Sequence, residues 1–252
     1  MLEAIIWGVV QGVTEFLPIS SDGHLVLVPA FLGIDPPDLA TTAVLHLGTL
    51  TAVLAYFWRD LIALSAFRSD PEARRLLTLI VIGSLPAALA LLVVDEIERL
   101  QESVTATAIF LIITGVVLAV ASRLPKGDRK ISDGRATDAV LIGFAQLLAV
   151  LPGISRSGMT IATGVARRFD QVEAARFSFL LGIPAVAAAG FLELWKLLDD
   201  GGVPASAWVG VLVAAVTGYG AIAFLLKILA RTGLAPFAVY CLVVGAIALV
   251  VL

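Results

Sequence analysis

The sequence predicts an all-α polytopic membrane protein, and three observations support this fold class. Of the 252 residues, 60% are hydrophobic and only 15% are charged, with a mean hydropathy of +1.01. A soluble domain carries about 25% charged residues, so this chain has too few charges to cover a surface in water. Its apolar residues form continuous runs, whereas a membrane β-barrel would show segments of ~10 alternating residues. The single cysteine, Cys241, excludes a secreted disulfide scaffold.

Six apolar windows are predicted to cross the membrane, since a spanning helix needs about 20 largely apolar residues. They comprise residues 41–58, 76–94, 104–122, 177–195, 206–226 and 236–252. Two further apolar stretches, 4–32 and 139–166, are each interrupted by a polar segment rich in Pro, Gly and Ser. Irregular backbone survives at membrane depth only where protein or water satisfies its polar groups. We therefore expect each stretch to form a re-entrant helical hairpin that returns to its own side.

The basic residues predict the orientation of these segments. If the six windows cross and the two hairpins return, four linkers share one side and hold 14 of the 17 Lys and Arg residues. These linkers are residues 59–75, 123–138, 167–176 and 227–235. The positive-inside rule makes their side cytoplasmic. The sequence therefore predicts a multi-pass protein of the plasma (inner) membrane, with both termini on the outer face.

An internal repeat is predicted within the single membrane domain, residues 1–252. The pair Gly8-x-x-Gln11 recurs 135 residues later as Gly143-x-x-Gln146, and later matches keep nearly the same spacing. Each copy contains three windows, an odd number, so the second copy would lie inverted relative to the first. Inverted repeats with broken helices place a binding site where the breaks meet. The two copies cover about residues 1–126 and about residues 136–252.

The two breaks contain most of the polar residues outside the linkers. The first offers Gln11, Glu15, Ser20, Ser21, Asp22 and His24, and the second offers Gln146, Ser155, Arg156, Ser157 and Thr160. Ionisable groups inside a membrane are costly and usually face a polar cavity in which they function. The alternative is that Glu15 and Arg156 merely pair to hold the hairpin tips together. Such a pair would not need so many hydroxyl groups beside it.

The second break has the features of a phosphate site. Residues 152–158 form a loop that leads into a helix, and the free N–H groups and dipole of a helix N-terminus attract anions. Ser155, Ser157 and Thr160 add hydroxyl donors, and the guanidinium of Arg156 supplies a planar fork for phosphate oxygens. The sequence therefore predicts that a phosphate or diphosphate group binds here.

The first break contains groups suited to hydrolysis. Glu15 and His24 would act as base and acid, and the nucleophile would be Ser21, His24 or an activated water. Gln11 lies one helical turn before Glu15, on the same face. Alternatively, Glu15 and Asp22 hold a hard divalent cation, Mg²⁺ or Ca²⁺, that bridges phosphate oxygens.

The two motifs resemble a known family. Gln11-x-x-x-Glu15-Phe-Leu-Pro-Ile-Ser-Ser-Asp-Gly-His24 and Pro152-Gly-Ile-Ser-Arg-Ser-Gly-Met-Thr160 are similar to the signature motifs of the undecaprenyl-pyrophosphate phosphatases, the bacitracin-resistance family. The resemblance covers the whole chain. It implies hydrolysis of a C55 polyprenyl diphosphate to the monophosphate and inorganic phosphate, which recycles the cell-envelope lipid carrier. It also implies a site open to the outer face and a homodimer. By motif position, the expected site residues are Glu15, Ser21, His24, Ser155, Arg156 and Thr160.

Two positions depart from the family pattern. Gln11 stands where the first acidic residue of the motif is common, which leaves Glu15 as the sole carboxylate of that pair. Asp22 replaces a small Ser or Thr and adds a negative charge beside the phosphate, so a bound metal or Arg156 is expected to balance it. With these departures, catalysis is assigned to Glu15, Ser21, His24 and Arg156, substrate binding to Gln11, Ser20, Ser155, Ser157 and Thr160, and metal binding to Glu15 and Asp22.

A transporter or flippase of a polyprenyl phosphate is the alternative function, since inverted repeats suit alternating access. The clustered acid, base and hydroxyl groups favour an enzyme, because a carrier needs the anion-binding loop but no acid or base. His46, near the start of the first window, either faces the site or packs between helices. The expected partners are a polyprenyl diphosphate lipid, membrane lipids and a second copy of the chain, with no nucleic acid.

Overall fold

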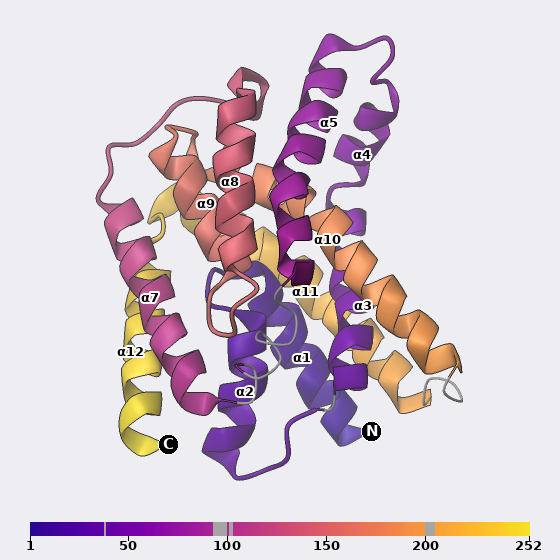
Figure 1. Ribbon diagram of the computed structural model, residues 1–252, viewed down its shortest axis with the longest axis vertical. Coiled ribbons are helices and arrows are strands. Elements are labelled where there is room, and N and C mark those ends of the chain that lie inside the picture. The colour runs from indigo at the N-terminus through magenta and orange to yellow at the C-terminus, as the bar shows by residue number, and fades with distance from the viewer. Residues whose placement is uncertain (38, 93–99, 101–102, 200–204) are drawn as a thin grey trace.

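The computed structural model describes residues 1–37, 39–92, 100, 103–199 and 205–252, and within these residues it contains helices but no β-strand (Figure 1). The α-helices are α1 (Leu2–Phe16), α2 (Ser21–Leu32), α3 (Leu39–Tyr56), α4 (Trp58–Ser65), α5 (Pro71–Ser84), α7 (Val104–Ser122), α8 (Ala136–Leu148), α9 (Arg156–Ala166), α10 (Gln171–Asp199), α11 (Ala205–Arg231) and α12 (Ala235–Val251). Two 3₁₀ helices are η1 (Leu85–Leu92) and η2 (Ile131–Asp133). The predicted all-α class is confirmed.

Several helices fit a multi-pass membrane protein. Within the described residues, three segments are long and apolar enough to cross a membrane: Pro71–Ala90, Val104–Ser122 and Ala205–Arg231. A fourth candidate is the pair Val44–Tyr56 and Trp58–Ser65, if the two helices form one bent span. Shorter apolar helices accompany them, including α2, α8 and α12.

Four of the six predicted windows fall on these candidate spans, whereas 177–195 and 236–252 fall in α10 and α12 and stay predictions as spans. Two of the four differ in detail from the helices that they contain. The window 41–58 ends in a sharp bend, because α4 departs from the axis of α3 by 71° immediately after Phe57. The window 76–94 begins inside α5 and continues as the 3₁₀ helix η1, which contains Pro86. Proline lacks the N–H that would continue an α-helical ladder, which accounts for the change. Residues 93 and 94 lie outside the described residues.

The two interrupted stretches form helix pairs that share one local structure at the break. Helix α1 packs against α2, and α8 packs against α9. Ser20 caps α2 by accepting a hydrogen bond from the Gly23 N–H (3.2 Å), and Ser155 caps α9 by accepting one from the Gly158 N–H (3.0 Å). The matching Ser-x-x-Gly motifs thus encode matching N-caps. Ser20 adopts a φ of +70°, and such backbone strain, about 1–3 kcal/mol, is typical of functional sites.

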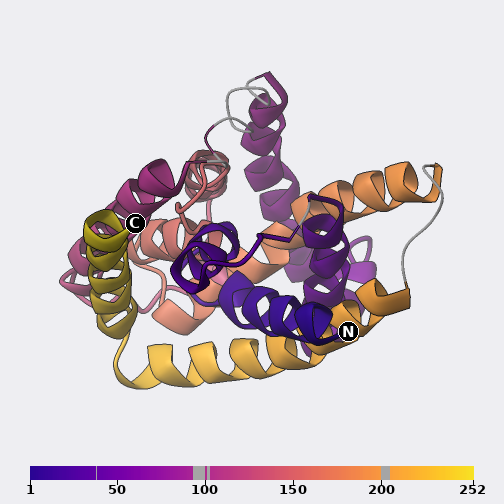
Figure 2. The ribbon, with the colours of Figure 1, turned by 90° about the horizontal axis from the view of Figure 1, so that it is seen from below.

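Small residues allow the long helices to approach closely. Figure 2 shows α1 lying along α11 and α7 lying along α12, and both pairs are in contact. A Cβ atom on Gly12 of α1 would lie 2.6 Å from the carbonyl oxygen of Ala214, and one on Gly245 of α12 would lie 2.6 Å from a side-chain carbon of Ile112. Packing through small residues is the usual way in which helices associate in lipid. These contacts position the two breaks next to each other in the centre.

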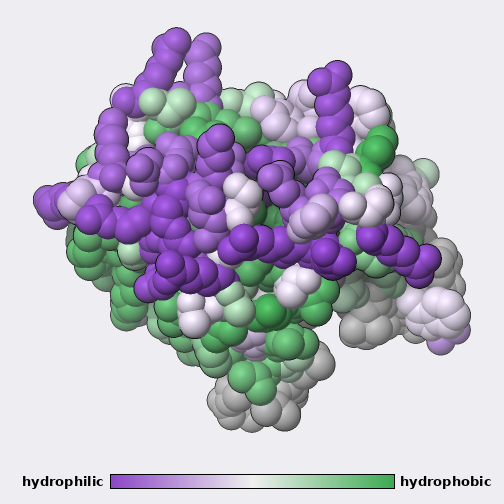
Figure 3. Space-filling view, turned by 90° about the horizontal axis from the view of Figure 1, so that it is seen from above, coloured by the Kyte–Doolittle hydropathy of each residue, from purple (hydrophilic) through white to green (hydrophobic). Residues whose placement is uncertain are grey.

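The polar connections gather at one end of the molecule. Hydrophilic residues cover this face in Figure 3, and both chain termini lie at the opposite end in Figure 1. At this end Asp138, whose side chain is 2% exposed, accepts hydrogen bonds from Arg129 and Arg167, each at 2.7 Å. Burial alone would raise the pKa of Asp138, but the two arginines outweigh burial and hold this pKa below its ordinary value. Asp138 thereby joins the linker, the start of α8 and the end of α9.

Candidate active site

The breaks of the two helix pairs meet in the protein interior. The Ser157 hydroxyl donates to the carbonyl oxygen of Leu17 (3.0 Å), which links the second break to the first. Thr114 of α7 holds the second break by donating to the Gly153 carbonyl oxygen (3.0 Å) and accepting from the Ser155 N–H (3.1 Å). Gly153 adopts a φ of +91°, and a Cβ there would lie 2.2 Å from a carbonyl oxygen of α7. Only glycine fits this position.

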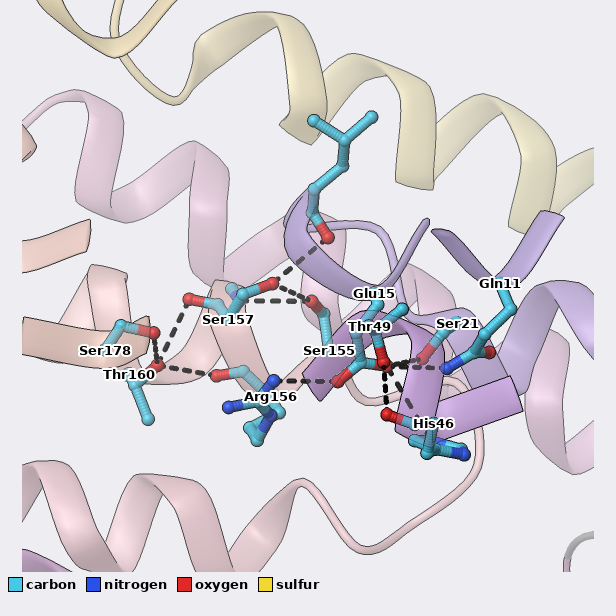
Figure 4. Close-up of polar contacts among 12 residues, drawn as sticks. Gln11, Glu15, Ser21, His46, Thr49, Ser155, Arg156, Ser157, Thr160 and Ser178 are labelled. Carbon is cyan, nitrogen blue, oxygen red and sulfur yellow. Dashed lines mark hydrogen bonds and ion pairs between the residues drawn. The ribbon is translucent and has the colours of Figure 1, made fainter. Parts of the chain in front are cut away.

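Glu15, in the last turn of α1, is the centre of the polar contacts (Figure 4). Its Oε1 accepts a hydrogen bond from Arg156 Nη2 at 2.7 Å, in a buried ion pair. Its Oε2 accepts from the Ser21 hydroxyl at 2.6 Å and from Gln11 Nε2 at 3.1 Å. His46 Nε2 lies 3.8 Å from the same oxygen. Residues from α1, α2, α3 and α9 therefore converge on one carboxylate.

Arg156 is fixed by its place in the fold as well as by Glu15. It is the first residue of α9, and its side chain is 17% exposed. The guanidinium lies against α10 at Gly182, where a Cβ atom would lie 1.5 Å from Nη1. Gly182 thus provides the room that Arg156 occupies. Removing either Arg156 or Glu15 would leave the other charge without its partner, so the position of each side chain depends on the other.

A small cavity borders this ion pair. Its volume is about 10 Å³, and its lining includes Glu15, Thr49 and Arg156 together with apolar side chains such as Phe179 and Val186. A cavity of this size holds about one water molecule. A diphosphate group therefore needs the helices around the pair to separate, or needs to take the place of Glu15 on Arg156.

His24 lies apart from the Glu15 cluster. Its Nδ1 lies 2.8 Å from the Ser20 carbonyl oxygen, and its Nε2 lies 2.7 Å from the Tyr240 hydroxyl of α12. Because a carbonyl oxygen only accepts, Nδ1 carries the proton, and Nε2 accepts from Tyr240 in the neutral ring. The two rings also stack, with centroids 5.6 Å apart. The structure thus places the His24 side chain in contact with α12 and with the backbone of the strained residue Ser20.

The remaining hydroxyl groups of the second break contact the protein itself. The Thr160 hydroxyl donates to the Arg156 carbonyl oxygen (2.7 Å) and lies 2.6 Å from the Ser178 hydroxyl of α10. The Ser155 and Ser157 hydroxyls lie 3.2 Å apart. Figure 4 shows the Thr160–Ser178 pair on the opposite side of Arg156 from Glu15. Among the side chains of the second break that were predicted to bind phosphate, Arg156 is therefore the one that contacts Glu15.

The predicted cation site consists of the carboxylates of Glu15 and Asp22. Mg²⁺ is commonly held by one or two carboxylates together with substrate phosphates and water, so this pair would hold it only beside a bound phosphate group. Both oxygens of Glu15 already accept hydrogen bonds, one of them from the positively charged Arg156. Among the described residues there is no group of three His, Cys, Asp or Glu side chains that could hold a metal ion. The cation site stays a prediction.

Four polar residues join the site or its surroundings without a clear signal in the sequence. His46 faces Glu15, which settles the alternative between site and packing that the sequence leaves open. Thr49 lies one turn after His46 and lines the cavity. Ser178 and Tyr240 are isolated polar residues in apolar helices, and only the packing of α10 and α12 reveals their partners.

The fold and the site together define a helical membrane protein with a charged pair buried where two broken helix pairs meet. The family model described as bacitracin resistance protein BacA matches residues 4–247, and the chain belongs to this family. The predicted family resemblance is confirmed.

Curated relatives match nearly the whole chain. A protein of Thermomicrobium roseum is 44% identical over 270 residues, which cover 99% of this chain and 97% of the relative. A protein of Geotalea daltonii is 42% identical over 263 residues, with 99% and 97% covered, and one of Micrococcus luteus is 42% identical over 263 residues, with 98% and 95% covered. Each of the three is named undecaprenyl-diphosphatase.

Proposed function

We propose that this protein is an undecaprenyl-diphosphate phosphatase, which hydrolyses the polyprenyl diphosphate to the monophosphate and inorganic phosphate and so recycles the cell-envelope lipid carrier. Membership of the family and the name shared by the relatives support this activity. The observation that carries the proposal is the buried contact of Glu15 with both Arg156 and the Ser21 hydroxyl. An anion-binding guanidinium, a base and a hydroxyl group are thus brought to one point.

Arg156 binds the diphosphate in this proposal. Its guanidinium is held in place by α9 and Gly182, and a planar fork suits two phosphate oxygens. In the structure Glu15 occupies one arm of that fork. When substrate enters, phosphate oxygens would replace Glu15 Oε1 as the acceptor of the hydrogen bond from Arg156 Nη2. Glu15 Oε1 would then be free, while Ser21 still donates to Oε2.

Ser21 is the nucleophile that the geometry supports best. Its hydroxyl already donates to Glu15 at 2.6 Å, the arrangement that general-base activation needs. Glu15 accepts the hydroxyl proton as Oγ bonds to the terminal phosphorus, the anhydride P–O bond breaks, and undecaprenyl monophosphate leaves. Glu15 returns that proton to the departing phosphate. It then takes a proton from the water that attacks phosphoserine, and inorganic phosphate is released as Ser21 regains its proton.

The two histidines act as positioning residues. His46 Nδ1 lies 2.9 Å from the Thr42 carbonyl oxygen, so Nδ1 carries a proton and Nε2 is the nitrogen that faces Glu15. His46 would thereby orient the carboxylate of Glu15. His24 supports the strained Ser20, which precedes Ser21, through its contacts with the Ser20 carbonyl and with Tyr240.

We also propose the full topology of six spans, two re-entrant hairpins and an inverted repeat, in a homodimer with the site open to the outer face. The positions of the helices and the recurrence of the Ser20 and Ser155 caps support this topology. The apolar walls between the helices would hold the isoprenoid tail while the diphosphate reaches the breaks.

Phosphate release from undecaprenyl diphosphate by the purified protein in detergent tests this function. We expect Glu15→Gln and Arg156→Ala to abolish release, because one removes the base and the other the anion site. Glu3→Gln and Arg59→Ala, which change exposed residues of the same types, should retain it. Activity that persists in both site variants, or lipid-phosphate exchange in vesicles without release by the unaltered protein, would contradict the proposal. A parallel measurement with EDTA tests the requirement for Mg²⁺ or Ca²⁺.

A further inference from the structure

A second pocket lies at the polar end of the molecule, between the first turns of α5 and α8 and away from Glu15. Its volume is about 540 Å³. Its lining includes Arg74, Arg75, Thr78, Leu79, Ile82 and Arg135. None of the described residues that line it is acidic, so three guanidinium groups surround the pocket without a carboxylate among them.

Arg75 gives this pocket its shape. Its Nε and Nη2 both donate to the Gly134 carbonyl oxygen, at 3.0 and 2.8 Å, which ties α5 to the residues just before α8. Arg74 and Arg135 are exposed on either side, and within the described part of the chain neither has a carboxylate within ion-pair distance. They are therefore free to bind an anion.

Three other arginines differ in this respect. Arg129 and Arg167 pair with Asp138, and Arg176 pairs with Asp60. Arg59 and Arg68 are exposed like Arg74 and Arg135 but do not line the pocket, so Arg74 and Arg135 are distinguished by their place around one pocket.

The pocket lies where a membrane-spanning helix begins. The segment Pro71–Ala90 is long and apolar enough to span, and Arg74 and Arg75 lie at the first and second turns, which would place them near the boundary between water and lipid if the segment crosses. Leu79 and Ile82 follow one to two turns deeper and give the pocket an apolar wall. Figure 3 shows that hydrophilic residues surround this end of the protein. The pocket therefore has a cationic rim and an apolar interior.

We propose that this pocket binds the phosphate headgroup of an anionic phospholipid, with Arg74 and Arg135 on the phosphate and the first acyl carbons against Leu79 and Ile82. Basic pockets between spanning helices are known to select acidic headgroups. A soluble anion would use the arginines but not the apolar wall, which favours a lipid. The proposal depends on α5 crossing the membrane and not on the catalytic roles of Glu15 or Ser21.

The test measures binding of phosphatidylglycerol and of phosphatidylcholine with the same acyl chains to the purified full-length protein, by native mass spectrometry. The pocket variant is Arg74→Gln with Arg135→Gln. The matched control is Arg59→Gln with Arg68→Gln, which removes two exposed arginines that do not line the pocket. Arg75 is left intact because its hydrogen bonds hold the pocket together.

We expect the unaltered protein and the control to prefer phosphatidylglycerol. The pocket variant should lose this preference, with its affinity for phosphatidylglycerol falling by about tenfold or more, because each basic group near the bilayer surface contributes about fivefold. Phosphate release from undecaprenyl diphosphate in detergent should be the same in all three proteins, which shows that they are folded. Equal losses in the pocket variant and the control, or no preference in the unaltered protein, would overturn the proposal.

Competition distinguishes a lipid site from a simple anion site. Inorganic phosphate and glycerol phosphate lack the acyl chains that would contact Leu79 and Ile82, so millimolar concentrations of either should leave phosphatidylglycerol bound. Displacement by inorganic phosphate at such concentrations would assign the pocket to a soluble anion and overturn its assignment to a lipid.

Discussion

Two buried carboxylates, Glu15 and Asp138, have similar exposure but different partners. Their side chains are 6% and 2% exposed. Asp138 accepts from two arginines and from the backbone N–H of Arg135, so both of its oxygens are held by groups that join the linker and two helix ends. These partners indicate that Asp138 stabilises the fold by linking these segments.

Glu15 has only one arginine, and its other oxygen bonds to neutral donors. One of these donors is the hydroxyl of Ser21, the proposed nucleophile, and a small cavity borders the Glu15–Arg156 pair. Burial of a carboxylate therefore does not distinguish catalysis from structure in this fold. The distinction lies in whether its partners include a group that can react, since the cavity beside Glu15 has room for about one water molecule.

The largest expected effect is the loss of catalysis in Ser21→Ala. Removing a nucleophile that acts as a unit with its base should lower the rate of phosphate release by at least about 10³-fold. Binding of substrate to Arg156 should persist. Rapid quenching with substrate labelled on the terminal phosphate should trap the label on Ser21 of the unaltered protein, and a label found on any other residue would refute the assignment of the nucleophile.

Asp138→Asn should instead destabilise the protein. Arg129 and Arg167 would lose their shared carboxylate but are 25% and 38% exposed, so we expect a loss of about 1–3 kcal/mol in the free energy of unfolding. The pKa of Asp138 is lowered in the folded state, so its contribution is present above its ordinary value of 3.8 and is lost as the pH falls through the folded value. Thermal unfolding in detergent at neutral pH and at pH 3 should show a difference between the two proteins that narrows in acid.

The variant Gly182→Ala tests the position of the Arg156 guanidinium beside Glu15 without changing any charge. The added methyl group would lie 1.5 Å from Arg156 Nη1 and must displace the guanidinium. A displacement of about 1 Å can lower a rate by about 10²-fold. Initial rates should show this loss, whereas Gly220→Ala on α11, whose added Cβ meets no described atom within 4 Å, should be as active as the unaltered protein.

His46→Gln should have the smallest of these effects. It removes a group that faces Glu15 at 3.8 Å but leaves Arg156 and Ser21 in place. We expect kcat to fall about tenfold, the equivalent of one ~1.4 kcal/mol interaction, with KM unchanged. A rise in KM with an unaltered kcat would place His46 in substrate binding instead.

Much of the helical framework could be predicted from the sequence. Continuous apolar runs located the helices, and interruption by Pro, Gly and Ser located both breaks, since these patterns depend only on neighbouring residues. The ion pair of Glu15 with Arg156 is the structural alternative that the hydroxyl groups argued against, and the structure contains that pair together with the Ser21 hydroxyl. The bend between α3 and α4 carried no such signal and could not be predicted.

The directions of individual side chains required the structure. His24 was expected beside Glu15 but contacts Tyr240, which is 216 residues away in the sequence. Thr160 was expected to bind phosphate but contacts Ser178 on α10. Both outcomes depend on which helix lies opposite, and no local pattern records that information. His46 entered the site for the same reason.

The comparison of the two carboxylates is tested most directly by one assay on two isosteric variants. Phosphate release from undecaprenyl diphosphate, normalised to folded protein, is measured for Glu15→Gln and for Asp138→Asn. We predict a loss of about 10²–10⁴-fold for Glu15→Gln, the range for a general base, and a normal rate per folded molecule for Asp138→Asn. Normal activity of Glu15→Gln would contradict the account, whatever the result for Asp138→Asn.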